Sequence, residues 1–569
     1  MIINARRVIR SAHIPDNIRD KVVDPEVWQI PSDRFILRDQ LVSQLDPSSS
    51  TSKDNRVNIA KLLERHSDLV AKSVNGGGDR YVKRHKERGK LLARERIELL
   101  LDQDSPFLEL SPIAGYGTTF HIGGSIITGI GVVADVECII IAHEPTVRGG
   151  SMNPYTLRKN LRALEIARVN RLPVINLVES GGADLPTQAD LFIPAGQIFR
   201  DLTKLSGLGI PTVAVVFGNS TAGGAYVPGM CDYSVMVDKG AKVFLGGPPL
   251  VKMATGEEST DEELGGAEMH SRVSGLSDFF AKDEYDAIRI GREIIYDLNW
   301  HKLGPGPSLE ADDPIYPPEE LLSIAPFDLK QPLDPKEVIA RVVDGSRFHE
   351  FKPTYGTSLV TGWASIHGYP VGILANARGV IFMDEAKKAT EFIMSANQSD
   401  TPLIFLQNTT GYMVGKNYEQ AGIIKDGAKM INAVTNSTVP HITVIIGASY
   451  GAGNYGMCGR AYEPRFLFMW PNAKIAVMGP QQLAGVMSIV ARESAISLNK
   501  HFDEKADLES RRSIEEQIER ESEAFFMSGK VYDDGIIDPR DTRTVLGIAL
   551  SAVHSQVVEG RKGYGIFRM

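Results

Sequence analysis

The sequence repeats itself at a constant offset along the chain. Two apolar runs, LPVINLVES and PTVAVVFG, return as TPLIFLQNT and PHITVIIG, and each is followed by a glycine-rich turn. The matched positions, all separated by the same interval, are Pro173 with Pro402, Pro211 with Pro440, Gly218 with Gly447, Gly224 with Gly453, and Tyr226 with Tyr455. A third pair, AKVFLGG at 241–247 and AKIAVMG at 473–479, has a slightly larger offset. This pattern predicts two homologous domains.

A proline-rich segment separates the two copies. Residues 301–338 contain eight prolines, which interrupt both helices and central strands. We therefore expect an N-terminal extension over 1–60, a first domain over 61–325 and a second over 326–569. In both domains, short apolar runs alternate with helical segments such as RKNLRALEIARVN. That alternation is typical of an α/β fold with buried strands.

Composition excludes several classes of function. The net charge of −9 argues against nucleic acid as a partner, since phosphate binding requires a basic face. No apolar run approaches the ~20 residues of a membrane span. Three scattered cysteines, Cys138, Cys231 and Cys458, form no CxxC pair, and we expect no bound metal. The N-terminal stretch contains Arg6, Arg7 and Arg10 but no apolar signal core, which favours a bacterial cytoplasm over the mitochondrial matrix.

Four glycine-rich turns are the candidate functional elements. They are ESGGADLP (179–186), NSTAGGAYVPG (219–229), NTTGYMVG (408–415) and ASYGAGNYGMCG (448–459). Glycine after a strand exposes backbone amides and lets a ligand approach closely. Where a helix begins there, its free N–H groups favour negative charge. Such amides can form an oxyanion hole, although tight packing alone would also explain a single glycine turn.

Two short motifs suggest other chemistry. Residues 447–451 match G-x-S-x-G, which would make Ser449 a hydrolase nucleophile with Asp503 and His554 downstream. The first copy has Ser220 at the equivalent place without that motif, so we interpret both serines as structural. Ala428–Lys429–Met430 is similar to a biotin-attachment sequence but lies in a helical stretch. We expect Lys429 to be a surface lysine.

At these residues the chain resembles the carboxyltransferase β subunits of biotin-dependent acyl-CoA carboxylases. The resemblance runs from about residue 93 to 548, through TVRGGSMNPYTLRK, LVESGGADLP, FLGGPPLVKMATGE, GAGNYGMCGRAY and IIDPRDTRTVLG. These segments are most similar to those of the 3-methylcrotonyl-CoA and geranyl-CoA carboxylase branch. The chain departs from the methylcrotonyl pattern after SGGADLP, where TQADLFIPAGQIFRDLTKLS is shorter than expected. The sequence therefore leaves open a substrate with a longer or saturated acyl chain.

The resemblance implies two tandem crotonase domains with a ββα-superhelix fold. It also implies a β homohexamer, an α6β6 complex with biotin-carrying α subunits, and an active site between two subunits. Biotin would be carried by the partner. The implied catalytic amides belong to Gly181, Gly182, Ala452 and Gly453. The implied acyl-CoA-binding residues are Arg148, Lys159, Ala183, Gly223, Gly224, Tyr226, Phe244, Gly246 and Gly247. The implied residues for biotin binding and acyl selectivity are Thr410, Gly411, Tyr412, Gly451, Asn454 and Tyr455.

Several alternatives remain at this stage. Arg148 and Lys159 could belong to an ordinary solvated face, and Tyr226 and Tyr455 could be core residues. A crotonase-type hydratase, an acyl-CoA decarboxylase and a non-catalytic scaffold for a biotin protein are the competing functions. No Walker A motif is present in the sequence, so ATP-dependent carboxylation of biotin would fall to another subunit.

Overall fold

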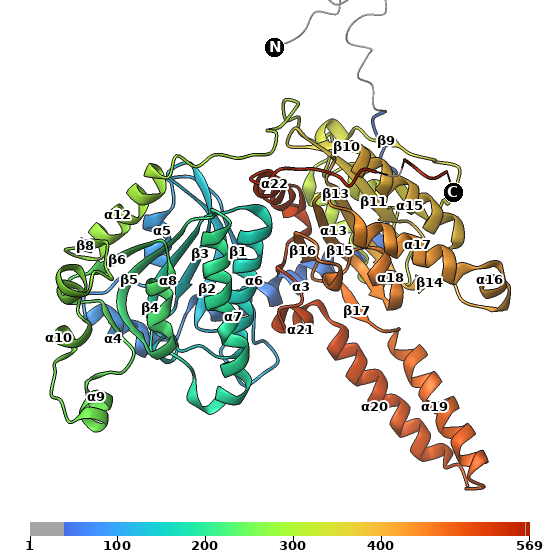
Figure 1. Cartoon of the computed structure of the whole chain (residues 1–569). Helices are drawn as coiled ribbons and strands as arrows, with labels where there is room; N and C mark the ends of the chain where they lie inside the picture. The colour runs from blue at the N-terminus through green and yellow to red at the C-terminus, as the bar shows by residue number, and fades with distance from the viewer. Residues whose placement is uncertain (1–38, 564, 569) are drawn as a thin grey trace, which may run out of the picture.

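The chain forms two large mixed β-sheets, each flanked by helices (Figure 1). A small parallel pair, β12 (Val380–Ile381) with β14 (Gly411–Tyr412), lies outside them. The computed structural model describes residues 39–563 and 565–568. Arg6, Arg7 and Arg10, on which the localisation expectation rests, lie outside the described residues. The first sheet has the order β1-β2-β3-β4-β5-β6-β8, with β7 paired to β5. Its strands are β1 (Phe107–Leu110), β2 (Ile126–Val133), β3 (Val136–His143), β4 (Val174–Ser180), β5 (Thr212–Thr221), β6 (Tyr233–Val237), β7 (Lys242–Phe244) and β8 (Phe279–Ala281).

The second sheet repeats this topology strand for strand. Its order is β9-β10-β11-β13-β15-β16-β18, with β17 paired to β15. In both sheets the first three strands are antiparallel and the remaining pairs are parallel. The strands are β9 (His349–Glu350), β10 (Leu359–Ile366), β11 (Tyr369–Asn376), β13 (Leu403–Thr409), β15 (His441–Tyr450), β16 (Phe466–Met469), β17 (Lys474–Ala476) and β18 (Gly535–Ile536). The expected α/β fold with an internal repeat is confirmed.

Helices cover both faces of the sheets. Side chains of successive strand residues point to opposite faces, so each sheet supplies two cores. In the first domain, α6 and α7 pack on one face and α5 and α12 on the other. In the second, α15 and α17 cover one face and α22 lies on the other. These helices are α5 (Ala93–Leu100), α6 (Pro154–Asn170), α7 (Gln188–Gly207), α12 (Glu284–Asp297), α15 (Met383–Gln398), α17 (Ile423–Asn436) and α22 (Thr542–Val553).

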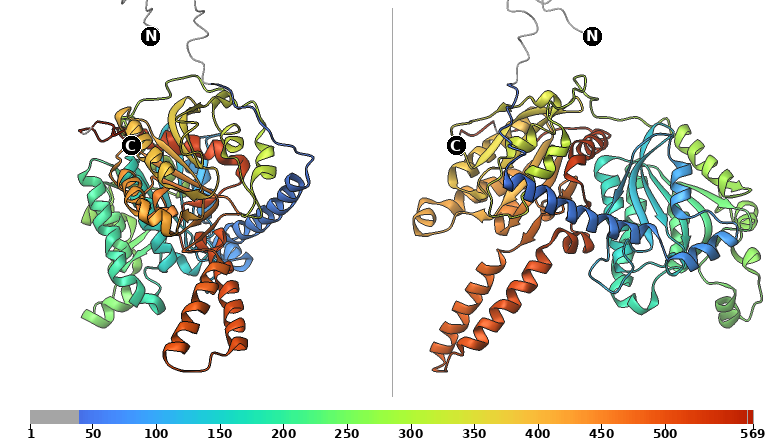
Figure 2. Two further views of the ribbon diagram at one scale, coloured as in Figure 1. Left: turned by 90° about the vertical axis from the view of Figure 1, so that its right-hand side faces the viewer. Right: turned by 180° about the vertical axis from the view of Figure 1, so that it is seen from behind.

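One long helix, α3 (Ser50–Val74), runs behind both domains (Figure 2). Its buried Asn55 side chain donates to the Ser323 carbonyl at 3.1 Å and accepts from the Phe327 amide at 3.1 Å. The segment around residue 325 is thus attached to a helix that precedes the first domain. Residue 60, where the sequence suggested the end of an extension, lies inside α3.

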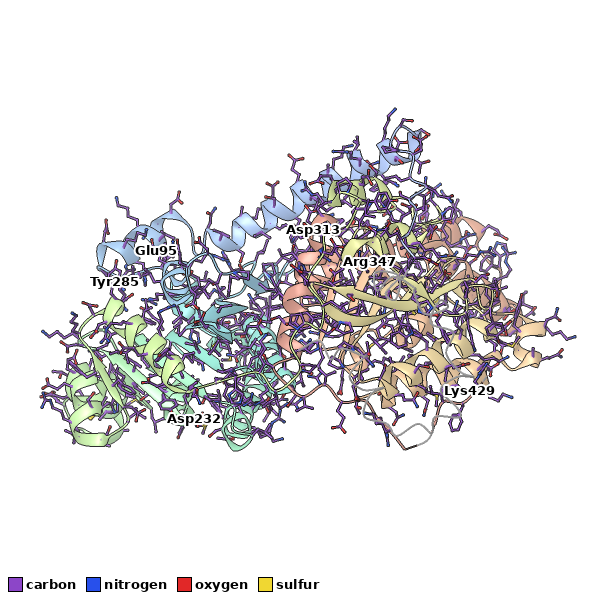
Figure 3. All side chains as sticks on the ribbon, turned by 90° about the horizontal axis from the view of Figure 1, so that it is seen from above. Glu95, Asp232, Tyr285, Asp313, Arg347 and Lys429 are labelled. Carbon is purple, nitrogen blue, oxygen red and sulfur yellow. The ribbon has the colours of Figure 1, made fainter. Side chains whose placement is uncertain are left out.

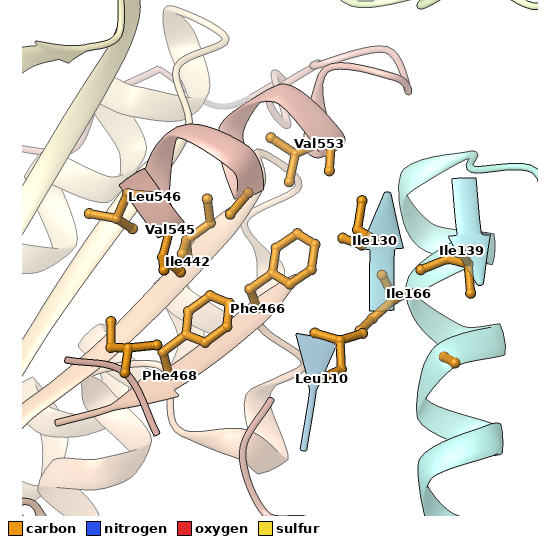
Figure 4. Close-up of a cluster of buried hydrophobic side chains, with 14 of the residues drawn as sticks. Leu110, Ile130, Ile139, Ile166, Ile442, Phe466, Phe468, Val545, Leu546 and Val553 are labelled. Atoms are coloured by element: carbon orange, nitrogen blue, oxygen red, sulfur yellow. The ribbon is translucent and has the colours of Figure 1, made fainter. Parts of the chain in front are cut away.

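The two domains share one hydrophobic core (Figure 4). Leu110 and Ile130 of the first sheet lie beside Phe466 of the second, and Val553 of α22 lies above Phe466. All four side chains are at most 2% exposed. Because the apolar face of each domain is buried against the other, the domains should unfold as one cooperative unit.

A buried ion cluster lies at the same junction. Asp534, which is fully buried, accepts from Nε of Arg162 at 2.8 Å and from Nη2 of Arg460 at 3.1 Å. Its other oxygen accepts from the Leu467 amide at 2.8 Å. Burial opposes the charged carboxylate, but the two arginines outweigh burial and hold the pKa of Asp534 far below its usual range.

The neighbouring Asp533 should make stability depend on pH. Burial, reinforced by the adjacent Asp534, raises the pKa of Asp533 to about 7. The folded chain therefore retains a proton that the unfolded chain loses near pH 4. Stability from this group is complete below pH 4 and is lost as pH rises through about 7, at up to ~1.4 kcal/mol per pH unit.

Urea unfolding of the wild type and of Asp533→Asn between pH 5 and 8 measures this loss. The asparagine variant should lose less stability across that range, while Asp534 stays ionised throughout. Parallel pH profiles for the two proteins would contradict the assignment.

A helical hairpin projects from the second domain. It consists of α19 (Pro480–Ser497) and α20 (Glu504–Ser522), and it extends away from both sheets in every view (Figures 1 and 2). Only Ala484 of α19 is buried, and Ile489 and Val490 are more than half exposed. Among the described residues, no helix combines the length and apolar character needed to cross a bilayer.

Candidate active site

In the first domain, two glycine turns lie against each other at the ends of β4 and β5. Gly182 has φ +93°, a left-handed conformation that favours glycine, and a Cβ there would lie 3.4 Å from the Thr221 carbonyl. Thr221 ends β5 and precedes a 3-10 turn, η4 (Ala222–Ala225), and a short helix, α8 (Tyr226–Met230). Neighbouring parallel strands thus bring the SGG and AGGA turns together.

Backbone hydrogen bonds decide which amides in this domain are free. Gly181 donates to the Gly149 carbonyl at 2.9 Å, whereas Gly182 has only a 3.2 Å contact to the Ser180 hydroxyl. In a 3-10 turn the third residue donates to the residue before the turn, so Gly224 is used and Gly223 is free. The available pair is Gly182 with Gly223. The sequence-based choice of Gly181 as a donor is not supported in this conformation.

The second domain repeats the arrangement with one difference. Thr410 donates to the Gly379 carbonyl at 2.5 Å, and Gly411 contacts the Thr409 hydroxyl at 3.2 Å. The next element is an α-helix, α18 (Gly451–Gly456), whose first three amides have no partner within the helix. Ala452 and Gly453 therefore have no acceptor within α18, and Gly453 lies against Gly411.

Gly453 is tightly enclosed. A Cβ there would lie 2.8 Å from Oγ1 of Thr409 and 2.9 Å from Cα of Gly411. Such distances are shorter than real Cβ contacts, so a side chain would displace the neighbouring turn. The absence of a side chain lets two amide-bearing segments meet at one point. In each domain, converging amides of this kind can stabilise negative charge on a ligand oxygen.

The prediction that Lys159 binds the phosphates of acyl-CoA is wrong. Lys159 is only 2% exposed, and its ammonium donates to the carbonyls of Gly123 and Ile126 at 3.2 and 2.8 Å. Burial lowers its pKa to about 8. Lys388, its counterpart at the repeat offset, donates to the carbonyl of Leu359 in the same way. The shared offset of Lys159 and Lys388 could be seen in the sequence, and it was a sign that both lysines have the same structural role.

The other candidates lie around the turns. Arg148 is 67% exposed at its side chain and forms a 3.0 Å ion pair with Asp184 beside the SGG turn. Tyr226 and Tyr455 are each 45% exposed, so neither is a core residue. Asn454 donates to the Ser449 hydroxyl at 2.8 Å, which directs its amide inward rather than toward a ligand.

The remaining predicted residues also lie on these segments. Tyr412 is largely enclosed, with its hydroxyl 3.5 Å from the Met430 sulfur. Gly451 has φ +54° at the start of α18. Ala183 lies in the SGG turn, and Phe244 is the last residue of β7. Gly246 and Gly247 come just before a short exposed helix, α9 (Pro248–Thr255).

The structure does not support a hydrolase triad. Ser449 is fully buried, and its hydroxyl donates to the Gln407 side chain at 2.7 Å. Asp503 caps α20, and the His554 ring lies against Tyr369. Ser449→Ala should change any hydrolysis rate by less than about 10-fold, whereas losing a nucleophile costs orders of magnitude more. A thioester hydrolysis assay on both proteins decides between these outcomes.

Lys429 is a surface residue, as expected. It pairs with Asp426 at 3.0 Å on α17 and lies at the periphery of the second domain (Figure 3). Among the described residues, no group of three or more histidine, cysteine or acidic side chains is arranged to hold a metal ion.

Comparison with known proteins identifies the family. Residues 84–562 match the carboxyl transferase domain family, which is most of the chain and includes all four turns. The chain is a carboxyl transferase. The resemblance seen in the sequence is confirmed, and the protein is an enzyme of this family rather than a scaffold.

The relatives of this carboxyl transferase cover nearly its whole length. It is 64% identical to the probable biotin-dependent acyl-coenzyme A carboxylase β2 subunit of Mycobacterium tuberculosis, over 93% of this chain and 100% of that one. It is 47% identical to the mitochondrial methylcrotonoyl-CoA carboxylase β chain of Dictyostelium discoideum, over 99% and 97%. The structure of the geranyl-CoA carboxylase β subunit of P. aeruginosa matches with a TM-score of 0.85 and 41% identity, over 93% and 100%.

Proposed function

We propose that this carboxyl transferase moves a carboxyl group from biotin, held on a partner subunit, to an acyl-CoA. The observation that carries this proposal is the duplicated amide site. Gly182 with Gly223 in the first domain, and Gly411 with Ala452 and Gly453 in the second, provide two separate places for an oxyanion. Carboxyl transfer requires two, because negative charge develops on the thioester oxygen and on the ureido oxygen of biotin.

The first domain would hold the acyl-CoA. Its amide pair would stabilise the thioester enolate, which acidifies the carbon next to the carbonyl or, in a conjugated acyl group such as 3-methylcrotonyl, the methyl carbon at the far end of the double bond. Phe199 of α7 lies beside Gly223, where a Cβ would be 3.5 Å from the ring, and packs edge-on against Tyr226 with ring centres 5.9 Å apart. These two rings are placed to contact the acyl chain close to the carbonyl.

The second domain would hold biotin. The residues fit such a ligand, since the cradle formed by Gly411 and Gly453 has no side chains and presents amides from two segments. Biotin supplies the carboxyl group when its carrier delivers it. Gly411, Ala452 and Gly453 would orient the ureido oxygen and stabilise its charge. The substrate proton would pass to biotin that has given up its carboxyl group, so no acidic or basic side chain at these turns is needed.

The relatives favour a branched, unsaturated acyl-CoA such as 3-methylcrotonyl-CoA. The segment after SGGADLP, residues 187–206, is shorter than the methylcrotonyl pattern and leaves longer or saturated acyl chains as the alternative. We further propose domains at 61–325 and 326–569, a β homohexamer in an α6β6 complex, an active site between two subunits, and a cytoplasmic bacterial setting.

Carboxylation assays on the complex with its biotin-carrying subunit test this function. The panel contains 3-methylcrotonyl-, geranyl-, acetyl-, propionyl- and palmitoyl-CoA, with ATP and bicarbonate. We expect one branched substrate to be preferred and avidin to abolish the reaction. Activity that persists with avidin, or hydration of crotonyl-CoA without biotin, would overturn the proposal. Decarboxylation of a carboxylated acyl-CoA without any forward carboxylation would instead indicate that the protein acts as an acyl-CoA decarboxylase.

A further inference from the structure

Glu179 occupies an irregular position in β4, shortly before Gly182. The register between β4 and β5 shifts here, because β4 advances from Val178 to Ser180 while β5 advances from Val216 to Ser220. The extra residues form a bulge in β5, and Glu179 lies opposite it. Its carboxyl group lies over Gly218 of β5, where a Cβ would be only 2.6 Å from Cδ of Glu179. Bulges beside active sites commonly redirect the end of a strand. Here the irregular pairing lies directly before the SGG turn of β4 and the AGGA turn of β5.

Two cations hold this carboxylate in place. Lys90 contacts Oε1 of Glu179 at 2.5 Å, and Arg96 contacts Oε2 at 2.7 Å. Lys90 also donates to the Phe217 carbonyl at 3.0 Å, so it joins Glu179 of β4 to the bulge of β5. Burial alone would raise the pKa of Glu179, but Arg96 and Lys90 outweigh burial and lower it. The side chain is therefore an ionised, nearly buried anchor.

The backbone around Glu179 is equally constrained. A Cβ on Gly150 would lie 2.3 Å from the Glu179 carbonyl, so the 149–151 loop packs directly on the backbone of Glu179. That same loop supplies the Gly149 carbonyl that accepts from Gly181. The Ser180 hydroxyl donates to the Gly150 carbonyl at 2.7 Å. Movement of Glu179 would thus pass directly to residues 180–182.

The second domain shows that the bulge itself is part of the repeated design. Asn408, the counterpart of Glu179 at the repeat offset, also lies at a register shift, and a Cβ on Gly447 would be 2.4 Å from its Oδ1. Asn408 accepts from the Ala448 amide at 3.0 Å. The second domain anchors its bulge with a neutral amide, whereas the first uses a carboxylate and two cations.

We propose that Glu179 is a positioning residue for carboxyl transfer, which sets the Gly182 amide against the Gly223 amide by holding the end of β4 against the bulge of β5. This proposal rests on the proposed function, because it assigns Gly182 to the acyl-CoA site. The Glu179 side chain itself does not contact substrate. Its ion pairs with Lys90 and Arg96 keep the turn in the geometry that the developing enolate requires.

Glu179→Gln is the decisive variant, and Glu284→Gln is its matched control. Glu284 of α12 contacts the opposite edge of the same arginine, with Arg96 Nε at 2.9 Å and Nη2 at 2.8 Å, but does not belong to the strand that carries the turn. Both variants remove one carboxylate charge from Arg96. Only the first should disturb the SGG turn.

We expect Glu179→Gln to lower kcat for the preferred acyl-CoA by about 10- to 100-fold, with KM for acyl-CoA changed less than about 3-fold. Glu284→Gln should keep kcat within about 3-fold of the wild type. Equal losses of kcat in both variants would show a merely structural role, and a wild-type kcat in Glu179→Gln would also overturn the proposal. Both kcat comparisons require that the wild type is active.

A second measurement does not depend on activity. Hydrogen–deuterium exchange of the peptide spanning residues 179–187 should be faster in Glu179→Gln than in the wild type and unchanged in Glu284→Gln, because the Gly181 amide loses its fixed acceptor. Unchanged exchange in Glu179→Gln contradicts the positioning role even if no acyl-CoA is carboxylated. A wild type inactive on every acyl-CoA would refute the proposed function alone.

Discussion

Replacing Gly453 with alanine is expected to reduce carboxyl transfer by about 100-fold. The added Cβ would lie 2.8 Å from Oγ1 of Thr409 and 2.9 Å from Cα of Gly411. Since one of these contacts is backbone, the clash cannot be relieved by rotating a side chain. The 409–411 turn and the start of α18 would separate, and the converging amides would no longer reach one oxygen.

The measurement is acyl-CoA carboxylation by the complete complex. A matched control is Gly485→Ala within α19, where a Cβ would meet nothing within 4 Å. That control should keep full activity and gain slightly in stability, as alanine favours a helix interior. Wild-type activity in a correctly assembled Gly453→Ala protein would remove this turn from the catalytic site.

Replacing Asp534 with asparagine is expected to lower the free energy of unfolding by about 3–5 kcal/mol, the usual loss when one partner of a buried ion pair is removed. The change leaves the Arg162 and Arg460 guanidinium groups without their buried carboxylate. Because Asp534 has a lowered pKa, the stability it contributes is present above pH 4 and is lost as pH falls below that value.

Urea unfolding at pH 7 checks this prediction, with Asp201→Asn as the control. Asp201 pairs with Arg200 at 2.7 Å, but the arginine side chain is 53% exposed, so its loss should cost less than about 1 kcal/mol. Equal midpoints for the two variants would show that the domain junction does not depend on the ion cluster.

Much of the fold was predictable because the relevant signals are local. Strand residues such as Val174–Ser180 form an apolar run that leads into a glycine turn, and a matching run returns at Leu403–Thr409. Local hydrophobic periodicity and turn glycines determine the elements. The repeat then implies the same order in both sheets. The glycine turns also carry part of the family resemblance, and the proposed roles of the Ala452 and Gly453 amides are what that resemblance implies.

Long-range contacts were not predictable in this way. Arg162 and Asp534 are 372 residues apart in sequence, and nothing local marks them as partners. Lys159 was misassigned because an isolated lysine is usually exposed, whereas its acceptors are carbonyls that only the fold brings near. Glu179 was not among the predicted site residues, because in the sequence it is only a charged residue near the end of a strand.

The sequence by itself determined that two α/β domains of one design occur in this protein, and that glycine turns follow their central strands. Its constant offset holds at both turns of each domain. Only the tertiary structure decided which amides can act. Gly181 and Thr410 are taken by the carbonyls of Gly149 and Gly379, while Gly182 and Gly411 are not. Gly182 and Gly411 donate only to the nearby hydroxyls of Ser180 and Thr409, at 3.2 Å each, whereas the carbonyls that occupy Gly181 and Thr410 come from segments about 30 residues away along the chain.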